Sequence, residues 1–282
     1  MISRILNKLY RVLHQTVFPP KCLVCNRLFQ PTGGDRGDIT ENEGGQKHVL
    51  PLTPLNRLGG LLSGSLCQAC IQQLIAVESP ICTCCGLPFK SRRETDHRCG
   101  ECIAEPKKFR IARAPLVYEQ TLTRVIHCFK YKGKIQLADP LAELLLTAFR
   151  LFWNTESIDL ILPVPLHLKK LRKRGFNQAY LLVRNWNTLA GQYFHDLTDL
   201  QIERDLLVRS LPTAPQSAFG RVKRATNIKN AFDLNGADRV KDKRILLIDD
   251  VYTTGATVNE CSRLLLNSGA RHVDILTLAR AI

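Results

Sequence analysis

One stretch near the carboxyl end of the chain, residues 244–257, constrains the fold more than any other. Its apolar run at 245–248 is typical of a parallel strand that is covered on both faces. Asp249 and Asp250 follow, where we expect the strand to end and to expose both carboxylates, and then come the small and hydroxylated residues 253–257. Beyond this loop, apolar residues recur at three- and four-residue spacing, which indicates a helix. The stretch therefore predicts the strand–loop–helix unit of an α/β fold.

The loop between this strand and this helix has the composition of a phosphate-binding site. Gly255 lets the backbone turn tightly and approach a ligand. A helix N-terminus presents free N–H groups and a partial positive charge to an anion. The carboxylates of Asp249 and Asp250 can accept hydrogen bonds from sugar hydroxyls, so a phosphorylated ribose matches both halves at the edge where open α/β sheets bind ligands. The alternative is a solvated pair of acids before an ordinary helix.

Residues 245–257 closely resemble the phosphoribosyl pyrophosphate (PRPP) signature of type I phosphoribosyltransferases. The resemblance implies a mostly parallel sheet flanked by helices, and Mg²⁺ bound together with PRPP. It also implies that Asp249 and Asp250 hold the ribose 2′ and 3′ hydroxyls. The 5′-phosphate is then wrapped by the loop residues Thr253, Thr254, Gly255, Ala256 and Thr257.

The cysteines indicate metal sites in the N-terminal part of the chain. Nine of the eleven cysteines lie between Cys22 and Cys102, and eight of these nine form Cys-x-x-Cys pairs. Such a pair lets both sulfurs reach one ion, and two pairs complete a tetrahedral zinc site. The simplest pairing places one Zn²⁺ on Cys22, Cys25, Cys67 and Cys70, and another on Cys82, Cys85, Cys99 and Cys102.

Alternatives to this pairing stay open in the sequence. Cys84 is left over and competes with Cys82 or Cys85 as a ligand, and His97 is a further candidate. An interleaved arrangement, a single occupied site or a redox role for one Cys-x-x-Cys pair would also fit. Gly86 directly after Cys85 suits a turn that needs a positive φ.

We divide the chain into residues 1–105, an N-terminal helix with a double zinc-ribbon-like module, and residues 106–282, a phosphoribosyltransferase-like domain. Residues 30–60 are rich in Gly, Pro and polar side chains, which predicts a mobile insertion. Residues 2–18 suggest an amphipathic helix that packs on the zinc module, on a partner or on the inner face of the membrane. No run reaches the ~20 apolar residues of a membrane-spanning helix, and no signal-peptide pattern is present, so we expect a cytoplasmic protein.

Patterns elsewhere predict the remaining elements. A short helix is expected at 71–75, and proline at the end of the strand 159–166 fixes a loop. Asn177 is expected to cap the helix that follows. The further strands and helices are expected at 111–118, 122–129, 141–152, 206–209 and 273–279.

The net charge of +15 favours an acidic partner, although a positive surface can serve solubility alone. A basic cluster follows the strand that ends in prolines, and an interrupted basic segment at 213–232 looks like a loop that closes over a ligand. Either would suit pyrophosphate or a nucleic-acid backbone, and a solvated helix face is the alternative. We assign to single-stranded DNA the residues Lys169, Lys170, Arg172, Lys173, Arg221, Lys223 and Arg224. We assign to PRPP, besides the signature, Pro165, Arg174, Asn177 and Gln178.

Taken together, these motifs resemble the competence protein F (ComF/GntX) family of phosphoribosyltransferase-like proteins with an N-terminal zinc-binding module. Its marks are the Cys-x-x-Cys knuckles, the PRPP-type signature and, between them, Phe129, Lys130, Tyr131, Val164, Pro165, Leu166, Arg174 to Gln178, Gln216, Arg224, Asn227, Asn230, Ala231 and Phe232. The resemblance covers nearly the whole chain and departs at the 30–60 insertion, at the N-terminal helix and at Cys84.

The resemblance implies a cytoplasmic PRPP-binding protein that handles incoming single-stranded DNA in competence and DNA uptake, with a competence helicase or DNA-processing proteins as partners. The alternative is an active phosphoribosyltransferase that passes the ribosyl group to a nucleotide-related acceptor, with Asp249, Asp250 and Lys130 as its catalytic residues. A stacking platform for DNA bases is sparse, since aromatic residues make up 7% of the chain.

Overall fold

The computed structural model describes residues 20–30, 60–89, 95–153, 158–194, 197, 199–211 and 230–282. Several predictions fall outside these residues and are not addressed by the structure: the N-terminal helix at 2–18, nearly all of the insertion, and the basic residues Arg221, Lys223 and Arg224.

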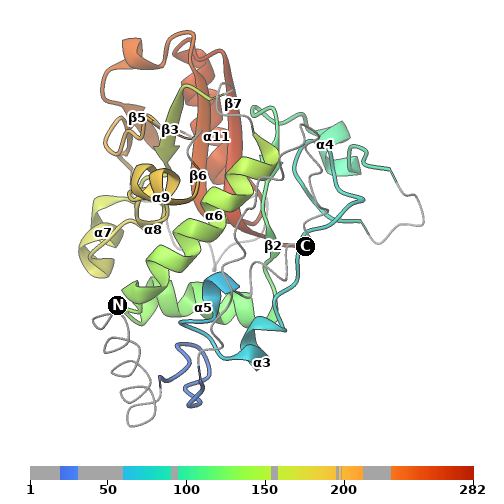
Figure 1. Ribbon diagram of the computed structural model, residues 1–282. Helices are drawn as coiled ribbons and strands as arrows, with labels where there is room; N and C mark the ends of the chain where they lie inside the picture. Colours follow the sequence, from blue (N-terminus) through green and yellow to red (C-terminus); the bar gives the residue numbers. More distant parts are fainter. Residues whose placement is uncertain are drawn as a thin grey trace, which may run out of the picture.

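The core of the molecule is a five-stranded sheet in which every strand pair is parallel (Figure 1). The strand order is β1-β7-β6-β3, and β2 also pairs with β7. The strands are β1 (Ala112–Arg113), β2 (Leu116–Val117), β3 (Leu160–Pro163), β6 (Arg244–Tyr252) and β7 (His272–Arg280). A separate antiparallel pair joins β4 (Leu207–Arg209) to β5 (Phe232–Leu234). The predicted α/β class with a mostly parallel sheet is confirmed.

Both faces of the sheet are covered, as the continuous apolar run of β6 predicts. Leu246 and Ile248 pack into one core with side chains of α5 (Gln120–Tyr131), α6 (Ala138–Phe152), α8 (Gln178–Leu181) and α9 (Trp186–Tyr193). Ile245 and Leu247, which point the other way, pack against α11 (Ala256–Asn267). The short elements are α3 (Gln68–Ile71), α4 (Gly100–Ala104), α7 (Leu168–Arg174), η1 (Ile135–Leu137) and η4 (Ala237–Val240).

The N-terminal cysteine-rich module packs against this sheet. Residues of its first part share the core of α5 and α6, whereas Cys82 and Cys85 share the core beneath α11. Backbone hydrogen bonds also join the two regions: Val77 N–H donates to Pro115 over 3.0 Å, and Ala112 N–H donates to Cys84 over 2.7 Å. Within the described residues, no helix has the length and apolar character needed to cross a membrane.

Three expectations about element boundaries are wrong. The strand does not end at the acids: β6 continues to Tyr252, because Val251 and Tyr252 pair with the last two residues of β7, and Asp250 is consequently buried. The expected strand at 111–118 is split into β1 and β2 around Pro115, which has no N–H for the ladder. The short helix α3 covers 68–71, not 71–75, because its turn begins directly at a cysteine knuckle.

Candidate functional site

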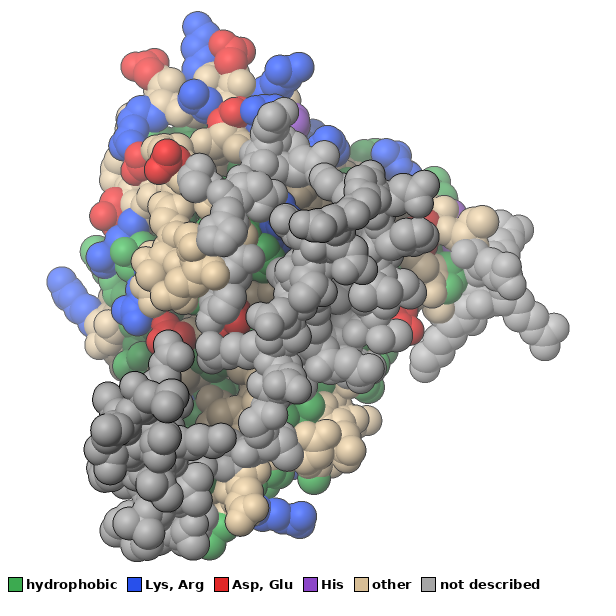
Figure 2. Space-filling view, in the orientation of Figure 1, with side chains coloured by type: hydrophobic (Ala, Val, Ile, Leu, Met, Phe, Trp, Pro, Cys, Tyr) green, Lys and Arg blue, Asp and Glu red, His purple; other side chains and the backbone are tan. Residues whose placement is uncertain are grey.

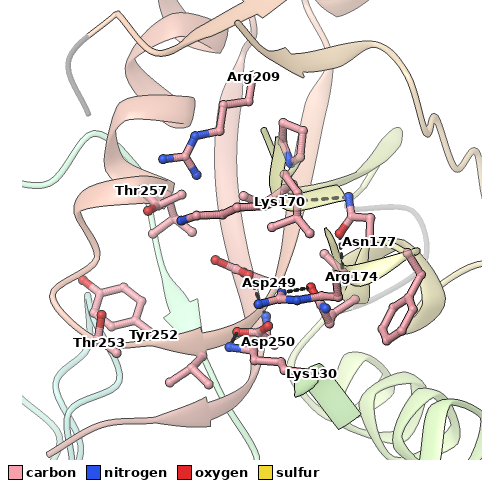
Figure 3. Close-up of a pocket in the computed structure, with 18 of the residues that line it drawn as sticks. Lys130, Lys170, Arg174, Asn177, Arg209, Asp249, Asp250, Tyr252, Thr253 and Thr257 are labelled. Carbon is pink, nitrogen blue, oxygen red and sulfur yellow. Dashed lines mark hydrogen bonds and ion pairs between the residues drawn. The ribbon is translucent and has the colours of Figure 1, made fainter. Parts of the chain in front are cut away.

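A cavity with a volume of about 580 Å³ opens at the carboxyl ends of β3 and β6, beside the start of α11 (Figure 3). Besides the strand ends and the loop before α11, the C-terminal end of α5 and the helices α7 and α8 contribute to its walls. This position is the edge of an open α/β sheet at which ligands bind.

Two carboxylates and a lysine form the floor of the cavity. Lys130 Nζ lies 2.6 Å from Asp250 Oδ1, and its side chain is only 18% exposed. Burial opposes the charge on the lysine, but the pairing with Asp250 outweighs it and raises the pKa of Lys130. Burial, and next the charge of Asp250, raise the pKa of Asp249 to about 7. The floor therefore holds one carboxylate fixed by an ion pair and one carboxyl that titrates near neutrality.

The loop before α11 has the geometry of an anion cradle. Gly255 is the N-cap of α11 with φ of 73°, in the left-handed region that favours glycine. A Cβ at this position would lie closer than 3.0 Å to the hydroxyl oxygen and Cζ of Tyr252, so the loop backbone packs directly on that ring. Thr253 to Thr257 line the cavity, and α11 begins among them, so N–H groups of its first turn can donate to an anion bound there.

Cationic side chains form a further wall of the cavity. Lys170, Lys173 and Arg174 of α7 line the cavity together with Arg209 at the end of β4. In Figure 3 Lys170 and Arg174, both of α7, and Arg209 of β4 extend into the space between Thr257 and the two acids. Burial, and next the neighbouring charge of Arg209, lower the pKa of Lys170. The wall thus concentrates positive charge, which an anionic ligand would neutralise.

Two amide side chains complete the wall. Asn177 caps α8 by accepting a hydrogen bond from the N–H of Ala179 over 3.0 Å, and its own amide donates to the carbonyl of Val164, which fixes α8 to the end of β3. Gln178 is 1% exposed, and Arg174 donates to its Oε1 over 2.5 Å. Its Nε2 has no hydrogen-bond partner among the described residues. A buried donor on the wall of a cavity indicates a ligand acceptor.

The structure brings the residues predicted for PRPP into one place. The signature acids and loop, together with Pro165, Arg174, Asn177, Gln178 and Lys130, all line the cavity. The α7 residues predicted for DNA lie in two places. Lys170 and Lys173 line the cavity, whereas Lys169 and Arg172 are exposed on the outer side of α7. Lys and Arg side chains project from the left and upper edges of the molecule in the space-filling view (Figure 2).

Arg209 and Tyr131 line the cavity, although the sequence interpretation assigned neither of them to a binding site. Arg209 follows an apolar strand, and a lone arginine at a strand end is the signal that could have identified it. Tyr131 is 64% exposed, and the guanidinium of Arg174 lies 4.8 Å above its ring, so an aromatic surface stands at the rim of the cavity.

The eight paired cysteines form two groups of four, each with its ligand atoms within 4.8 Å of one another. These groups are Cys22, Cys25, Cys67 and Cys70, and Cys82, Cys85, Cys99 and Cys102. A tetrahedral zinc thiolate site, with bonds of about 2.3 Å, separates its sulfurs by about 3.8 Å. The sulfurs of Cys22 and Cys70 lie 3.8 Å apart, and those of Cys85 and Cys99 lie 3.7 Å apart. The donor type and the spacing fit zinc at both sites.

Hydrogen bonds within the second group also fit a metal site. The N–H groups of Cys85 and Cys99 donate to the sulfur of Cys82 over 3.4 and 3.3 Å, as expected for a thiolate ligand. Among the described residues, Cys84 and His97 belong to neither group. Gly86 has φ of 66°, and a Cβ there would lie 2.7 Å from the carbonyl oxygen of Ala112, so this knuckle requires glycine.

Comparison with known proteins places these two parts in one family. The phosphoribosyl transferase domain model matches residues 199–282, and the double zinc ribbon domain model matches residues 60–103. The DNA utilization protein YhgH of Escherichia coli O157:H7 is 30% identical over 220 residues, which cover 77% of this chain and 91% of that protein. Competence protein F of Haemophilus influenzae is 30% identical over 225 residues, which cover 78% of this chain and 93% of that protein. The chain belongs to the competence protein F family.

The competence protein F family assignment fits the architecture. The matched transferase domain contains Asp249, Asp250 and the loop before α11, and the matched zinc ribbon contains all ligands except Cys22 and Cys25. Among solved structures, a purine phosphoribosyltransferase from Pyrococcus horikoshii Ot3 is 16% identical and covers 51% of this chain and 73% of that chain, with a TM-score of 0.27.

Proposed function

We propose that this protein binds PRPP, or the ribose 5-phosphate part of a related ligand, and that it handles single-stranded DNA in the cytoplasm during DNA uptake or utilization. The observation that carries the ligand proposal is the meeting of two carboxyl groups, a helix N-terminus and four cationic side chains in one cavity. The names of the relatives, a DNA utilization protein and a competence protein, support the second part.

Each part of PRPP matches a different set of residues in the cavity. The 5′-phosphate accepts from the loop N–H groups around Gly255. The ribose hydroxyls donate to Asp249 and Asp250, and the ion pair with Lys130 orients the second carboxylate. The pyrophosphate faces the cationic wall and the Nε2 of Gln178, and bound Mg²⁺ would neutralise part of its charge. Several cations lie close together on this wall, so a polyanion gains more here than a neutral sugar would.

The DNA part rests on the outer side of α7. Lys169 and Arg172 are exposed beside the cavity, and the guanidinium of Arg172 is free to approach a phosphate backbone from solvent. Tyr131 at the rim offers one ring face on which a base could stack. Single-stranded DNA would therefore lie across α7 and the cavity mouth, with little sequence preference.

A matched pair of variants separates the two binding modes. One double variant carries Lys170→Gln and Lys173→Gln, and the other carries Lys169→Gln and Arg172→Gln. They remove equal charge from the cavity side and from the outer side of α7. We expect the first pair to weaken PRPP binding in the presence of Mg²⁺, measured by calorimetry, by more than tenfold. We expect the second pair to spare that ligand but to weaken single-stranded DNA binding, measured by fluorescence anisotropy. Each lost phosphate contact should reduce the slope of log K against log salt by about 0.7.

Either of two results would reject the proposal. Native protein that binds neither ligand at low ionic strength would reject it entirely. If both pairs weakened both ligands equally, the two faces of α7 would not have separate roles, and only non-specific charge attraction would remain.

One observation favours the second candidate function, an active phosphoribosyltransferase. A carboxyl whose pKa is raised to about 7, such as Asp249, can accept a proton at neutral pH. In that reaction the bond from ribose C1 to pyrophosphate breaks, the acceptor bonds to C1, and Asp249 takes the acceptor's proton. Pyrophosphate release from PRPP, measured with and without single-stranded DNA, tests it, and release no faster than without protein would reject transfer.

A further inference from the structure

Arg280, the last residue of β7, joins the second cysteine group to the phosphate loop. Arg280 as a whole is only 7% exposed. On one side, Nε donates to the carbonyl of Cys85 over 3.1 Å, and Nη2 lies 3.6 Å from the Cys85 sulfur. On the other side, Nη1 donates to the carbonyls of Tyr252 and Thr253 over 3.4 and 3.2 Å, and it also contacts the carbonyl of Ala281. One planar guanidinium therefore bonds to a metal ligand and to the start of the loop.

The link continues through the ring of Tyr252 to the loop itself. The guanidinium of Arg280 lies 4.3 Å above this ring, and Phe109 makes a T-shaped contact with it, with ring centroids 6.1 Å apart. The hydroxyl of Tyr252 lies directly under Gly255, where no Cβ would fit. A displacement of Arg280 would thus move both the Thr253 backbone and the surface on which the Gly255 turn packs.

We propose that Arg280 is a positioning residue through which zinc at the second cysteine group stabilises the phosphate-binding conformation of residues 252–257. This inference rests on the proposed function, since it concerns the same phosphate site. Zinc-bound cysteines are thiolates, and four of them outweigh the charge of one Zn²⁺. The loaded site therefore attracts the guanidinium through a charge-assisted bond, which is stronger than a bond to a neutral thiol. A lysine could not replace Arg280, because a single ammonium cannot donate to Cys85 and to the Tyr252–Thr253 carbonyls at once, as the forked guanidinium does.

The first cysteine group provides the internal control. Cys22, Cys67 and Cys70 share the core of α5 and α6 on the other face of the sheet, whereas the second group shares its core with Tyr252. Zinc at the first group should therefore have little effect on the phosphate loop.

Binding linkage gives the test, because a ligand that gains affinity from zinc must raise the affinity for zinc by the same factor. Native, zinc-loaded protein is titrated with a colorimetric chelator, with and without saturating ribose 5-phosphate. We expect the ligand to raise the zinc affinity of one of the two sites by about 5-fold or more, the lower end of typical coupling. The effect should persist in Cys22→Ser with Cys25→Ser, which retains the second site, and it should be lost in Arg280→Lys.

The outcomes separate this inference from the proposed function. If calorimetry shows ribose 5-phosphate binding to native protein but the ligand leaves zinc retention unchanged, the coupling is rejected and the proposed function stands. If Arg280→Lys binds zinc and keeps the full protection, coupling exists but does not pass through Arg280, and the proposal is rejected. If native protein does not bind ribose 5-phosphate, both are rejected.

Discussion

Replacement of Gly255 by alanine tests the packing of the phosphate loop on Tyr252. The backbone at Gly255 has φ of 73°, and a left-handed conformation costs an alanine about 1–2 kcal/mol. The added Cβ would also overlap the hydroxyl and Cζ of Tyr252. That ring cannot move cheaply, because Tyr252 is 3% exposed and is held by Arg280 and Phe109. Overpacking of this kind costs about 1–3 kcal/mol, so we expect Gly255→Ala to lower the free energy of unfolding by about 2–5 kcal/mol in total.

Gly269 is the matched control for this variant. Its φ is 92°, but a Cβ there would meet only Lys241 atoms at 3.5 Å or more, which is ordinary contact. Gly269→Ala should therefore cost only the backbone part, about 1–2 kcal/mol.

Urea unfolding of both zinc-loaded variants, followed by circular dichroism, measures the two costs. Calorimetry with ribose 5-phosphate measures the functional consequence. We expect ligand binding to be lost in Gly255→Ala and retained in Gly269→Ala. Equal unfolding costs together with retained binding in both variants would refute the proposed packing of the loop on Tyr252.

Three further predictions concern the metal and two carboxyl groups. Replacing Cys99 and Cys102 by serine should remove about one zinc ion per chain and destabilise the ribbon, because metal binding is coupled to folding; an unchanged metal analysis would contradict this. The pKa of Asp249 is raised to about 7, so its stabilising contribution is complete below the unfolded value of 3.8 and is lost as the pH rises through about 7. Asp249→Asn should therefore increase the free energy of unfolding more at pH 8 than at pH 5, and the reverse order would be inconsistent with a buried carboxyl. Hydrogen bonds from Arg244 hold the pKa of Asp159 at about 2, so its contribution is present above 3.8 and lost as the pH falls toward 2. Asp159→Asn should lower stability at pH 7 and change it little near pH 2.

Local signals make the strand–loop–helix unit predictable from the sequence. The apolar run, the glycine and the helical spacing each act over a few residues, and they give β6, the turn at Gly255 and α11. The cysteine spacing likewise predicts the two groups that the structure brings together, because a two-residue gap fixes the geometry of a knuckle.

Long-range contacts explain what the sequence could not predict. The end of β6 depends on its register with β7, which pairs Tyr252 with Arg280. The ion pair of Lys130 with Asp250 joins residues 120 positions apart. The basic run is one cluster in the sequence, but α7 turns Lys170 toward the cavity and leaves Lys169 in solvent, since neighbouring helical residues point about 100° apart.

The most direct test of the proposed function is calorimetry with PRPP and Mg²⁺ on native protein and on Asp249→Asn with Asp250→Asn. Asparagine has the shape of aspartate and keeps an oxygen that can accept from the backbone N–H of residue 250 and from Lys130 Nζ, so this variant removes charge with the least change in shape. Each charge-assisted hydrogen bond contributes about 1.5–3 kcal/mol, so loss of both carboxylates should weaken PRPP binding by more than tenfold. Asp159→Asn, outside the cavity, serves as the control and should bind like the native protein. Equal affinities for native protein and the double variant, or no binding by native protein, would contradict a PRPP site at these acids.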